Sequence, residues 1–369
     1  MRQVAPSPAA TATALEPAAD LSEPPVLANE CPAIDGGAED EIAAQASALV
    51  PLKPGLTLST TWHRTTEADE VECLTHVRAV DADAVAVTAS CAMREATHTA
   101  SRRECRVDLH SAYMFSTGAG DEPDVLKGAT MLGLSKTSFG ELKAKGTTRH
   151  RNVTMYEGRL IGDLDGALSR QGTGSFAATV NDRVVELPVI RAAGTLRGIA
   201  MGKSVETRVE AAILDDERFP LILEYALRDL GTKGFSVRYT KLSYPTDGEL
   251  EERLASTKQV DVYGIYFDVG SDRIREESEP VLREIAVALA HNPEWTLSID
   301  GHTDSAGGEA YNLDLSRRRS EAVRTALVER YAIAAVRLTT RGFGASQAKD
   351  TNDTAEGRAR NRRVELVRQ

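Results

Sequence analysis

Two charged residues, Asp304 and Arg319, lie where the chain could hold a small charged ligand. Asp304 follows the apolar alternation of Leu297 and Ile299, which predicts a strand, and a glycine-bearing loop leads from it to a predicted helix. Arg319 lies about one turn into that helix, so tertiary folding can aim both side chains at one point. A carboxylate beside a guanidinium matches the two charges of a zwitterion. We therefore predict a zwitterion-binding corner in residues 301–319.

The same stretch resembles the OmpA-like peptidoglycan-binding domain family. The motifs that carry the resemblance are Gly301-His302-Thr303-Asp304, Asn312-Leu313, Leu315-Ser316, Arg319 and Asn361-Arg362-Arg363-Val364. The resemblance runs from about residue 260 to 367 and implies a β-α-β-α-β fold that grips the meso-diaminopimelate of the peptidoglycan stem peptide. It implies that Asp304 and Arg319 dominate this grip. The further contacts that it implies come from Phe267, Asp268, Thr303, Asn312, Leu315 and Arg362.

The chemistry of diaminopimelate fits the two dominant residues. Its free end carries an ammonium and a carboxylate on one carbon, so Asp304 can pair with the cation while Arg319 holds the anion in a two-pronged geometry. Lysine lacks that carboxylate. Because hydrogen bonds to charged groups contribute about 1.5–3 kcal/mol, we expect roughly tenfold or greater discrimination against lysine. The alternative is a structural ion pair between loop and helix, and the flanking motifs favour the ligand site.

The surrounding residues show the periodicities of strands joined by helices. Strands are expected at 260–267, 297–299, 338–341 and 364–366, and helices from Pro280 to about 292 and from the binding loop to about 331. This order favours a sheet covered on one face. His302 has no second His or Cys at ligand spacing, so we expect a hydrogen-bonded structural histidine and no metal site.

Composition indicates a soluble protein with more than one domain. The chain has 369 residues, a net charge of −11, 41% hydrophobic and 5% aromatic residues. The excess acidity makes nucleic acid an unsuitable partner. Residues 1–40 are rich in Ala, Pro, Thr and acidic residues and cannot bury a core, which predicts a disordered tether. No apolar run is long enough for a membrane helix, and no signal peptide is visible, so we expect that an export signal was removed or replaced.

Residues 49–244 have the pattern of many short strands separated by turn residues. The expected strands are 56–62, 71–80, 84–93, 105–115, 152–160, 174–180, 183–187, 205–214, 221–227 and 235–242. This spacing favours an antiparallel open barrel or sandwich. We therefore predict an α+β chain with a tether at 1–40, a β-rich domain at 41–250 and an OmpA-like β-α-β-α-β domain at 251–369.

The end of the β-rich domain also resembles the half-barrels of periplasmic lipoprotein carriers. The resemblance rests on residues 205–214, the turn at 215–221 and the strand that contains Leu223 and Tyr225. It implies an apolar concave face that can hold an acyl chain. The other interpretation is that the domain fills this face with its own side chains.

Four cysteines in an exported protein predict two disulfides, for which three pairings exist. Cys73 and Cys91 are equidistant from Ala82, and Cys91 and Cys105 are equidistant from His98, so all three can lie on neighbouring strands. Because directly opposed cysteines in a tight hairpin often strain the bridge, we favour Cys91 with Cys105, which leaves Cys31 for Cys73.

The sequence predicts a binding protein rather than an enzyme. It contains no Gly-x-Ser-x-Gly elbow, no phosphate loop and no His pair at metal-binding spacing, and we expect no cofactor. The prediction is a non-catalytic protein of the periplasm or cell envelope, associated with the outer membrane, that binds peptidoglycan and tethers its β-rich domain to the wall. That domain would face another envelope protein or lipid. The alternative is a lipid or small-ligand carrier or sensor that uses the wall only for placement.

Overall fold

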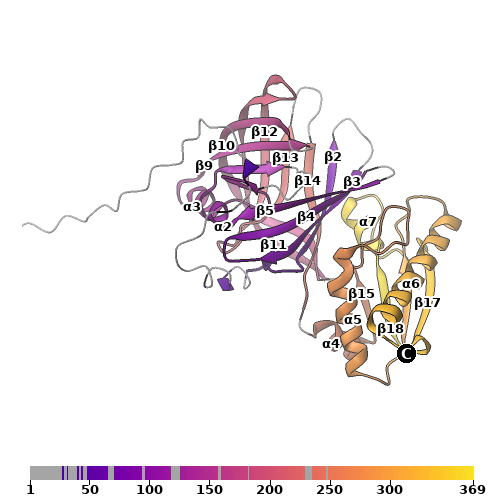
Figure 1. The fold of residues 1–369 in the computed structure, drawn as a ribbon. Coiled ribbons are helices and arrows are strands. Elements are labelled where there is room, and N and C mark those ends of the chain that lie inside the picture. Colours follow the sequence, from indigo (N-terminus) through magenta and orange to yellow (C-terminus); the bar gives the residue numbers. More distant parts are fainter. Residues whose placement is uncertain are drawn as a thin grey trace, which may run out of the picture.

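The protein is described by a computed structural model that shows two β-sheet regions side by side (Figure 1). The described residues are 27–28, 31, 40, 43–44, 48–64, 70–93, 96–117, 125–156, 159–181, 183–228, 235–246 and 248–369. We call residues 48–246 the β region and residues 248–369 the C-terminal region.

The predicted tether lies outside the described residues except at 27–28, 31 and 40. Residues 27–28 and Cys31 are attached to the β region. β1 (Leu27–Ala28) pairs with β7 (Val125–Leu126), and Cys31 is bonded to Cys105. The prediction of a free tether is therefore wrong at these residues.

The described part of the β region forms one twelve-stranded sheet that curls on itself. Its order is β5-β4-β3-β2-β14-β13-β12-β11-β10-β9-β6-β8, and β10 also pairs with β14 through Thr179 and Val180. The strands are β2 (Thr57–Arg64), β3 (Glu70–Val80), β4 (Ala84–Met93), β5 (Ala96–Cys105), β6 (Met114–Thr117), β8 (Ala129–Thr130), β9 (Thr147–Tyr156), β10 (Arg159–Val180), β11 (Arg183–Ala200), β12 (Lys203–Leu214), β13 (Ile222–Arg228) and β14 (Phe235–Ser243). The β10–β14 pairing joins the two ends of a run of five strands.

The curled sheet encloses packed apolar side chains. Burial alternates along the first part of β12, as expected for a strand with one face toward a core, whereas the consecutive residues Ala211, Ala212, Ile213 and Leu214 are all buried. One cluster includes Leu58, Val87 and Phe176, and a second includes Leu164, Leu196 and Tyr225. The face that the carrier resemblance would give to a ligand thus holds the chain's own side chains.

Two helices of the β region depart from the sequence prediction. Residues 106–111 form α2 (Arg106–Ser111), in the middle of the segment 105–115 that was expected as a strand. The helix α3 (Lys136–Lys145) was not predicted, although Ser135 caps its start and Gly146 ends it with a left-handed conformation. Both caps are visible in the sequence and could have predicted this helix.

The C-terminal region is a four-stranded sheet with the order β15-β18-β16-β17. Its elements are α4 (Glu249–Thr257), β15 (Gln259–Val262), α5 (Glu279–His291), β16 (Leu297–His302), α6 (Glu309–Tyr331), β17 (Leu338–Gly344), α7 (Ala355–Asn361) and β18 (Val364–Arg368). The strands and helices expected from the periodicities are present, but the first strand ends at Val262 and α4 and α7 are additional. Leu289, Ile299, Val323 and Leu366 belong to the core between sheet and helices. Among the described helices, including the 23-residue α6, none has the length and apolarity to cross a bilayer.

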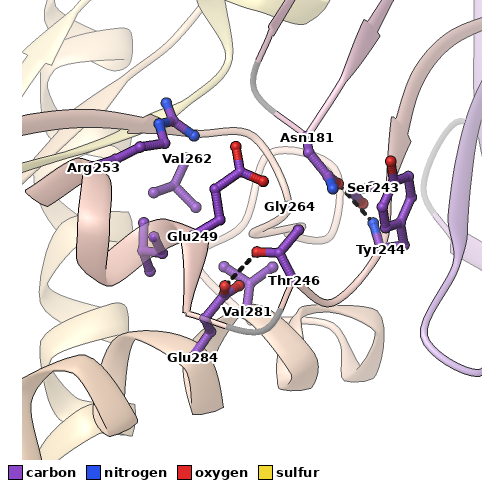
Figure 2. A pocket seen from close by; sticks show the side chains of 11 residues that line it. Asn181, Ser243, Tyr244, Thr246, Glu249, Arg253, Val262, Gly264, Val281 and Glu284 are labelled. Carbon is purple, nitrogen blue, oxygen red and sulfur yellow. Dashed lines mark hydrogen bonds between the residues drawn. The ribbon is translucent and has the colours of Figure 1, made fainter. Parts of the chain in front are cut away.

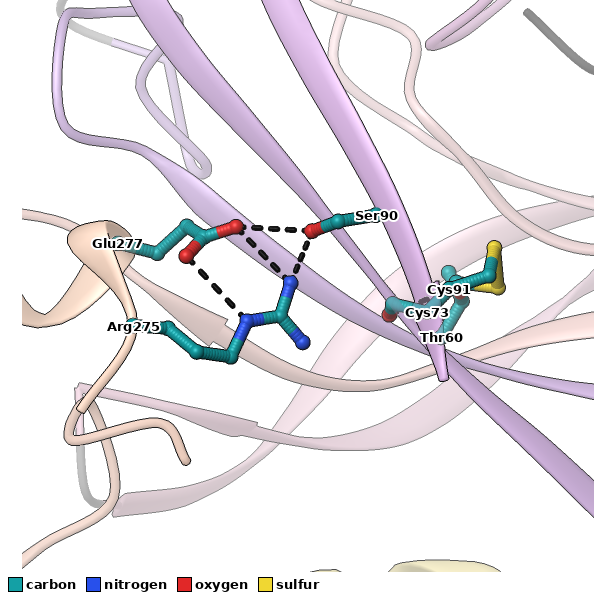
Figure 3. The surroundings of a disulfide bond; sticks show 6 residues. All are labelled: Thr60, Cys73, Ser90, Cys91, Arg275 and Glu277. Carbon is teal, nitrogen blue, oxygen red and sulfur yellow. Dashed lines mark hydrogen bonds and ion pairs between the residues drawn. A yellow bond between two sulfur atoms is a disulfide. The ribbon is translucent and has the colours of Figure 1, made fainter. Parts of the chain in front are cut away.

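All four cysteines are bridged, but the predicted pairing is wrong. The structure joins Cys31 to Cys105 and Cys73 to Cys91. Cys73 and Cys91 lie directly opposite each other on β3 and β4, with their Cα atoms 4.0 Å apart (Figure 3). Cys105 lies opposite Ala84, at the other end of β4, and therefore cannot reach Cys91.

A small polar cavity lies where β14 leads into α4 (Figure 2). Its volume of about 30 Å³ suits a water molecule rather than an organic ligand. Thr246 donates a hydrogen bond of 2.5 Å to Glu284, and the backbone N–H of Tyr244 donates one of 2.9 Å to Asn181. The cavity is part of the junction between the two regions, and none of the predicted site residues lines it.

Candidate functional site

The site is built by a close approach of α6 to the ends of two strands. A Cβ on Gly301 of β16 would lie 2.2 Å from the carbonyl oxygen of Ser316, and a Cβ on Gly342 of β17 would lie 2.5 Å from the backbone nitrogen of Arg317. Only glycine fits at these two positions, so α6 packs directly on the sheet. The helix begins at Glu309, which places Arg319 about three turns into it rather than one.

Asp304 lies in the loop after β16 and its carboxylate has two partners. One oxygen, Oδ1, accepts a hydrogen bond of 3.0 Å from the backbone N–H of Ala306. The other, Oδ2, accepts one of 2.7 Å from Nη1 of Arg362. The side chain remains 12% exposed. A fixed, partly accessible carboxylate of this kind can pair with an ammonium group.

Arg319 is held by the loop that follows β15. Its Nε donates to the carbonyl oxygen of Ser271 at 2.9 Å, and its Nη2 donates to that of Asp268 at 3.4 Å. The guanidinium lies over the ring of Phe267, 4.8 Å from the centroid. Within the described chain, Nη1 makes no hydrogen bond. Phe267 and Asp268 therefore position the guanidinium and leave part of it available for an anion.

Three further predicted residues support the loop and helix that carry these charges. Asn312 donates to the carbonyl oxygens of Asp304 and Ala306, at 3.3 and 3.0 Å, and so fixes the loop. Leu315 is buried, and with Asn312 and Arg319 it follows the spacing of one face of α6. The hydroxyl of Thr303 is buried and has no hydrogen-bond partner in the described part of the chain.

Arg362 connects Asp304 to a residue that the sequence analysis missed. Its Nη2 lies 3.1 Å from a carboxylate oxygen of Glu72, which belongs to β3 of the β region. Burial, and then the positive charge of Arg362, lower the pKa of Arg319 to about 10, while the carboxylates of Asp304 and Glu72 act in the opposite direction. These charges therefore surround one small volume. No local sequence pattern marks Glu72, since its role depends on contact between two regions.

His302 is buried beside the site but does not make the hydrogen bonds that we predicted. Neither ring nitrogen has a hydrogen-bond partner among the described residues, and the ring stacks on Phe343 with centroids 5.2 Å apart. Burial, and then the charge of Arg363, lower the pKa of His302 to about 4, so the ring is neutral at physiological pH. The described residues contain no cluster of His, Cys, Asp and Glu suited to a metal ion.

Comparison with known proteins gives matches in the C-terminal part of the chain. Residues 266–362 match the OmpA family. Outer membrane porin F of Pseudomonas aeruginosa is 41% identical over 101 residues, which are 27% of this chain and 29% of that protein. The probable lipoprotein YiaD of Escherichia coli is 35% identical over 103 residues, 28% of this chain and 47% of its own length. The chain thus matches less than half of each of these two relatives.

A solved structure is similar over the same part. The peptidoglycan-associated lipoprotein from Burkholderia pseudomallei is 30% identical and covers 28% of this chain and 88% of its own, with a TM-score of 0.27. The family match begins just before Phe267 and ends at Arg362, so it contains every predicted site residue and leaves out Glu72. The C-terminal part of this chain, residues 266–362, is an OmpA family domain.

Proposed function

We propose that this protein is a non-catalytic component of the cell envelope that binds peptidoglycan through the meso-diaminopimelate of an uncrosslinked stem peptide. The observation that carries the proposal is the convergence of one carboxylate, Asp304, and two guanidinium groups, Arg319 and Arg362, at the strand ends of an OmpA family domain. The named relatives, an outer membrane porin and a probable lipoprotein, support an envelope location.

The free end of diaminopimelate carries one positive and one negative charge, and each is opposite in sign to a protein group at this site. Its ammonium pairs with the carboxylate of Asp304, which is fixed by the backbone of Ala306. Its carboxylate accepts hydrogen bonds from Arg319, whose other donors are held by the carbonyl groups of Asp268 and Ser271. Thr303, next to Asp304, lies buried beneath this pair of charges. Each ligand charge thus meets a protein group that is already in place, which lowers the ordering cost of binding.

In this proposal the chain has a β-rich domain at about residues 41–250, which includes the β region, and a wall-binding domain at 251–369 that keeps it in place. The described residues of the β region's interior include the packed clusters around Leu164, Phe176 and Tyr225. This packing supports tethering over the lipid-carrier alternative. The β region would contact another envelope component, which is different from the wall peptide that the C-terminal region binds.

Cosedimentation with purified sacculi tests the proposal. Wild type, Asp304→Ala and Arg319→Ala are compared at physiological ionic strength, with Arg317→Ala as the matched control. Arg317 lies on the same helix but is exposed and pairs with Asp314. Wild type and Arg317→Ala should sediment equally, while much smaller fractions of the other two variants should sediment. Equal sedimentation of all four folded proteins would reject the site.

A further inference from the structure

A carboxylate of the β region lies at the ligand site of the C-terminal region. Glu72 is on β3, and its Oε2 lies 3.1 Å from Nη2 of Arg362. The same guanidinium donates from Nη1 to Asp304 at 2.7 Å. Glu72 also lies close enough to Arg319 for its negative charge to raise the pKa of that guanidinium. Arg362, one of the two guanidinium groups at the site, is therefore already paired with a carboxylate of the chain itself, and the charge of that carboxylate also acts on Arg319.

Glu72 is held in this position by its own strand neighbours. Ser59 on β2 donates a hydrogen bond of 2.9 Å to its other carboxylate oxygen. Burial alone would raise the pKa of Glu72, but the charges of Arg362 and Lys241 and the bond from Ser59 lower it to about 2. The next residue, Cys73, is bonded to Cys91 on β4. Glu72 is thus a permanent anion on a cross-linked hairpin.

The hairpin is held against the C-terminal region by polar contacts. Figure 3 shows Arg275 and Glu277 together with Ser90 of β4, and Ser90 donates to Glu277 at 2.8 Å. Arg78 at the end of β3 pairs with Glu276 at 2.5 Å, with both side chains largely exposed. Contacts between regions that consist of ion pairs and hydrogen bonds separate more readily than apolar ones. Because β3 is hydrogen-bonded to β2 on one side and to β4 on the other, Glu72 leaves the site when the β region moves as a unit and breaks these polar contacts.

We propose that Glu72 is an internal competitor for the peptidoglycan site. Its carboxylate pairs with Arg362 and offsets the positive charge of Arg319 beside the place where the carboxylate of diaminopimelate would bind, so the ligand must compete with it. The affinity of the whole chain for the wall is then set by how easily the β region, with Glu72, moves away from Arg362. This inference rests on the proposed function, because it concerns the same site.

Isothermal titration of the whole chain with a soluble tripeptide, L-Ala-γ-D-Glu-meso-diaminopimelate, tests this proposal. Glu72→Gln keeps the size of the side chain and its hydrogen bond with Ser59 but removes the charge. Glu276→Gln is the matched control, since it removes an ion pair between the same two regions away from the ligand site. Glu72→Gln should bind the tripeptide about tenfold more tightly than wild type, within the usual range for coupled equilibria. Glu276→Gln should bind like wild type.

The outcomes separate this inference from the function on which it rests. Unchanged or weaker binding by Glu72→Gln would overturn the competition, and weaker binding would make Glu72 a ligand contact instead. Equal tightening by both variants would show that loosening of the interface, not Glu72, controls the site. Arg319→Ala, measured in parallel, should bind much more weakly than wild type. If it binds as wild type does, the proposed function fails, whatever the glutamate variants do.

Discussion

The guanidinium of Arg319 lies on the ring of Phe267, 4.8 Å from its centroid. This contact orients the cation that we assign to the ligand carboxylate. Phe267→Leu keeps an apolar residue but removes the ring face, so the affinity for the tripeptide should fall by about two- to thirtyfold, the equivalent of about 0.5–2 kcal/mol for a partly buried cation–π contact. Calorimetric titration measures the change.

A double-mutant cycle gives the control for Phe267. In an Arg319→Ala background the Phe267→Leu change should have no further effect on residual binding to sacculi, because the contact that it removes is already gone. An equal loss in both backgrounds would mean that Phe267 touches the ligand directly and does not act through Arg319.

Lysine should not replace Arg319. The guanidinium donates to two backbone carbonyl groups, of Ser271 and Asp268, and still has Nη1 for a ligand. A lysine ammonium lacks this planar fork and cannot hold both carbonyls and a carboxylate in the same geometry. Arg319→Lys should therefore bind the tripeptide at least tenfold more weakly, whereas Arg317→Lys should be unaffected. Wild-type affinity of Arg319→Lys would show that charge alone is needed.

The elements of the C-terminal region could be predicted because their signals are local. Apolar periodicity predicted β16 and α6, and the spacing from Asp304 to Arg319 then placed both charges at one end of the sheet. The detail of the pairing was not predictable, since Asp304 binds Arg362 from the far end of the domain. The contact of Glu72 was missed for the same reason. It depends on how two regions pack, and no periodicity of β3 encodes that.

The disulfide error has a different physical origin. The symmetry of Cys73 and Cys91 about Ala82 was visible in the sequence and corresponds to their observed register. We gave more weight to the strain expected of opposed cysteines than to this register. Strand register fixes which side chains face each other, and it places Cys105 opposite Ala84 instead.

Each disulfide should contribute to stability according to the loop that it closes. The Cys31–Cys105 bridge joins residues 74 positions apart, and the Cys73–Cys91 bridge joins residues 18 positions apart. Chain-entropy arguments give about 4 kcal/mol for the longer loop and about 3 kcal/mol for the shorter one. Denaturant unfolding of the two double Cys→Ser variants should show losses in that order. Peptide mapping of the non-reduced protein should find Cys73 linked to Cys91, and a Cys91–Cys105 peptide would contradict the structure.

Glu104 should make the β region less stable as the pH rises. Burial raises the pKa of this carboxyl to about 7, although the backbone N–H of Met131 and the charge of Arg102 act against the shift. Between about pH 4.5 and 7 the folded chain keeps a proton that the unfolded chain releases, so the free energy of unfolding falls with increasing pH. Glu104→Gln removes this dependence. The free energy of unfolding of Glu104→Gln minus that of wild type should increase by on the order of 3 kcal/mol between pH 4.5 and 7.5.

The control for Glu104 is Glu206→Gln in the same region. Glu206 is exposed and paired with Arg197, which lowers its pKa. The free energy of unfolding of Glu206→Gln, relative to that of wild type, should therefore not rise over this pH range. Denaturant titrations at several pH values measure both variants. Parallel profiles for wild type and Glu104→Gln would show that Glu104 is ionised in the folded chain.

The proposed ligand geometry predicts which stem peptide the protein prefers. A tripeptide that ends in L-lysine offers the ammonium to Asp304 but no carboxylate to Arg319, so it should bind at least tenfold more weakly than the meso-diaminopimelate tripeptide. In Arg319→Ala this preference should disappear, because the group that reads the second charge is absent. Asp304→Ala, in contrast, should weaken both peptides, since both carry the ammonium. Competition calorimetry of the two peptides with the three proteins measures these preferences. A preference for diaminopimelate that survives in Arg319→Ala would assign the carboxylate to Arg362 rather than to Arg319.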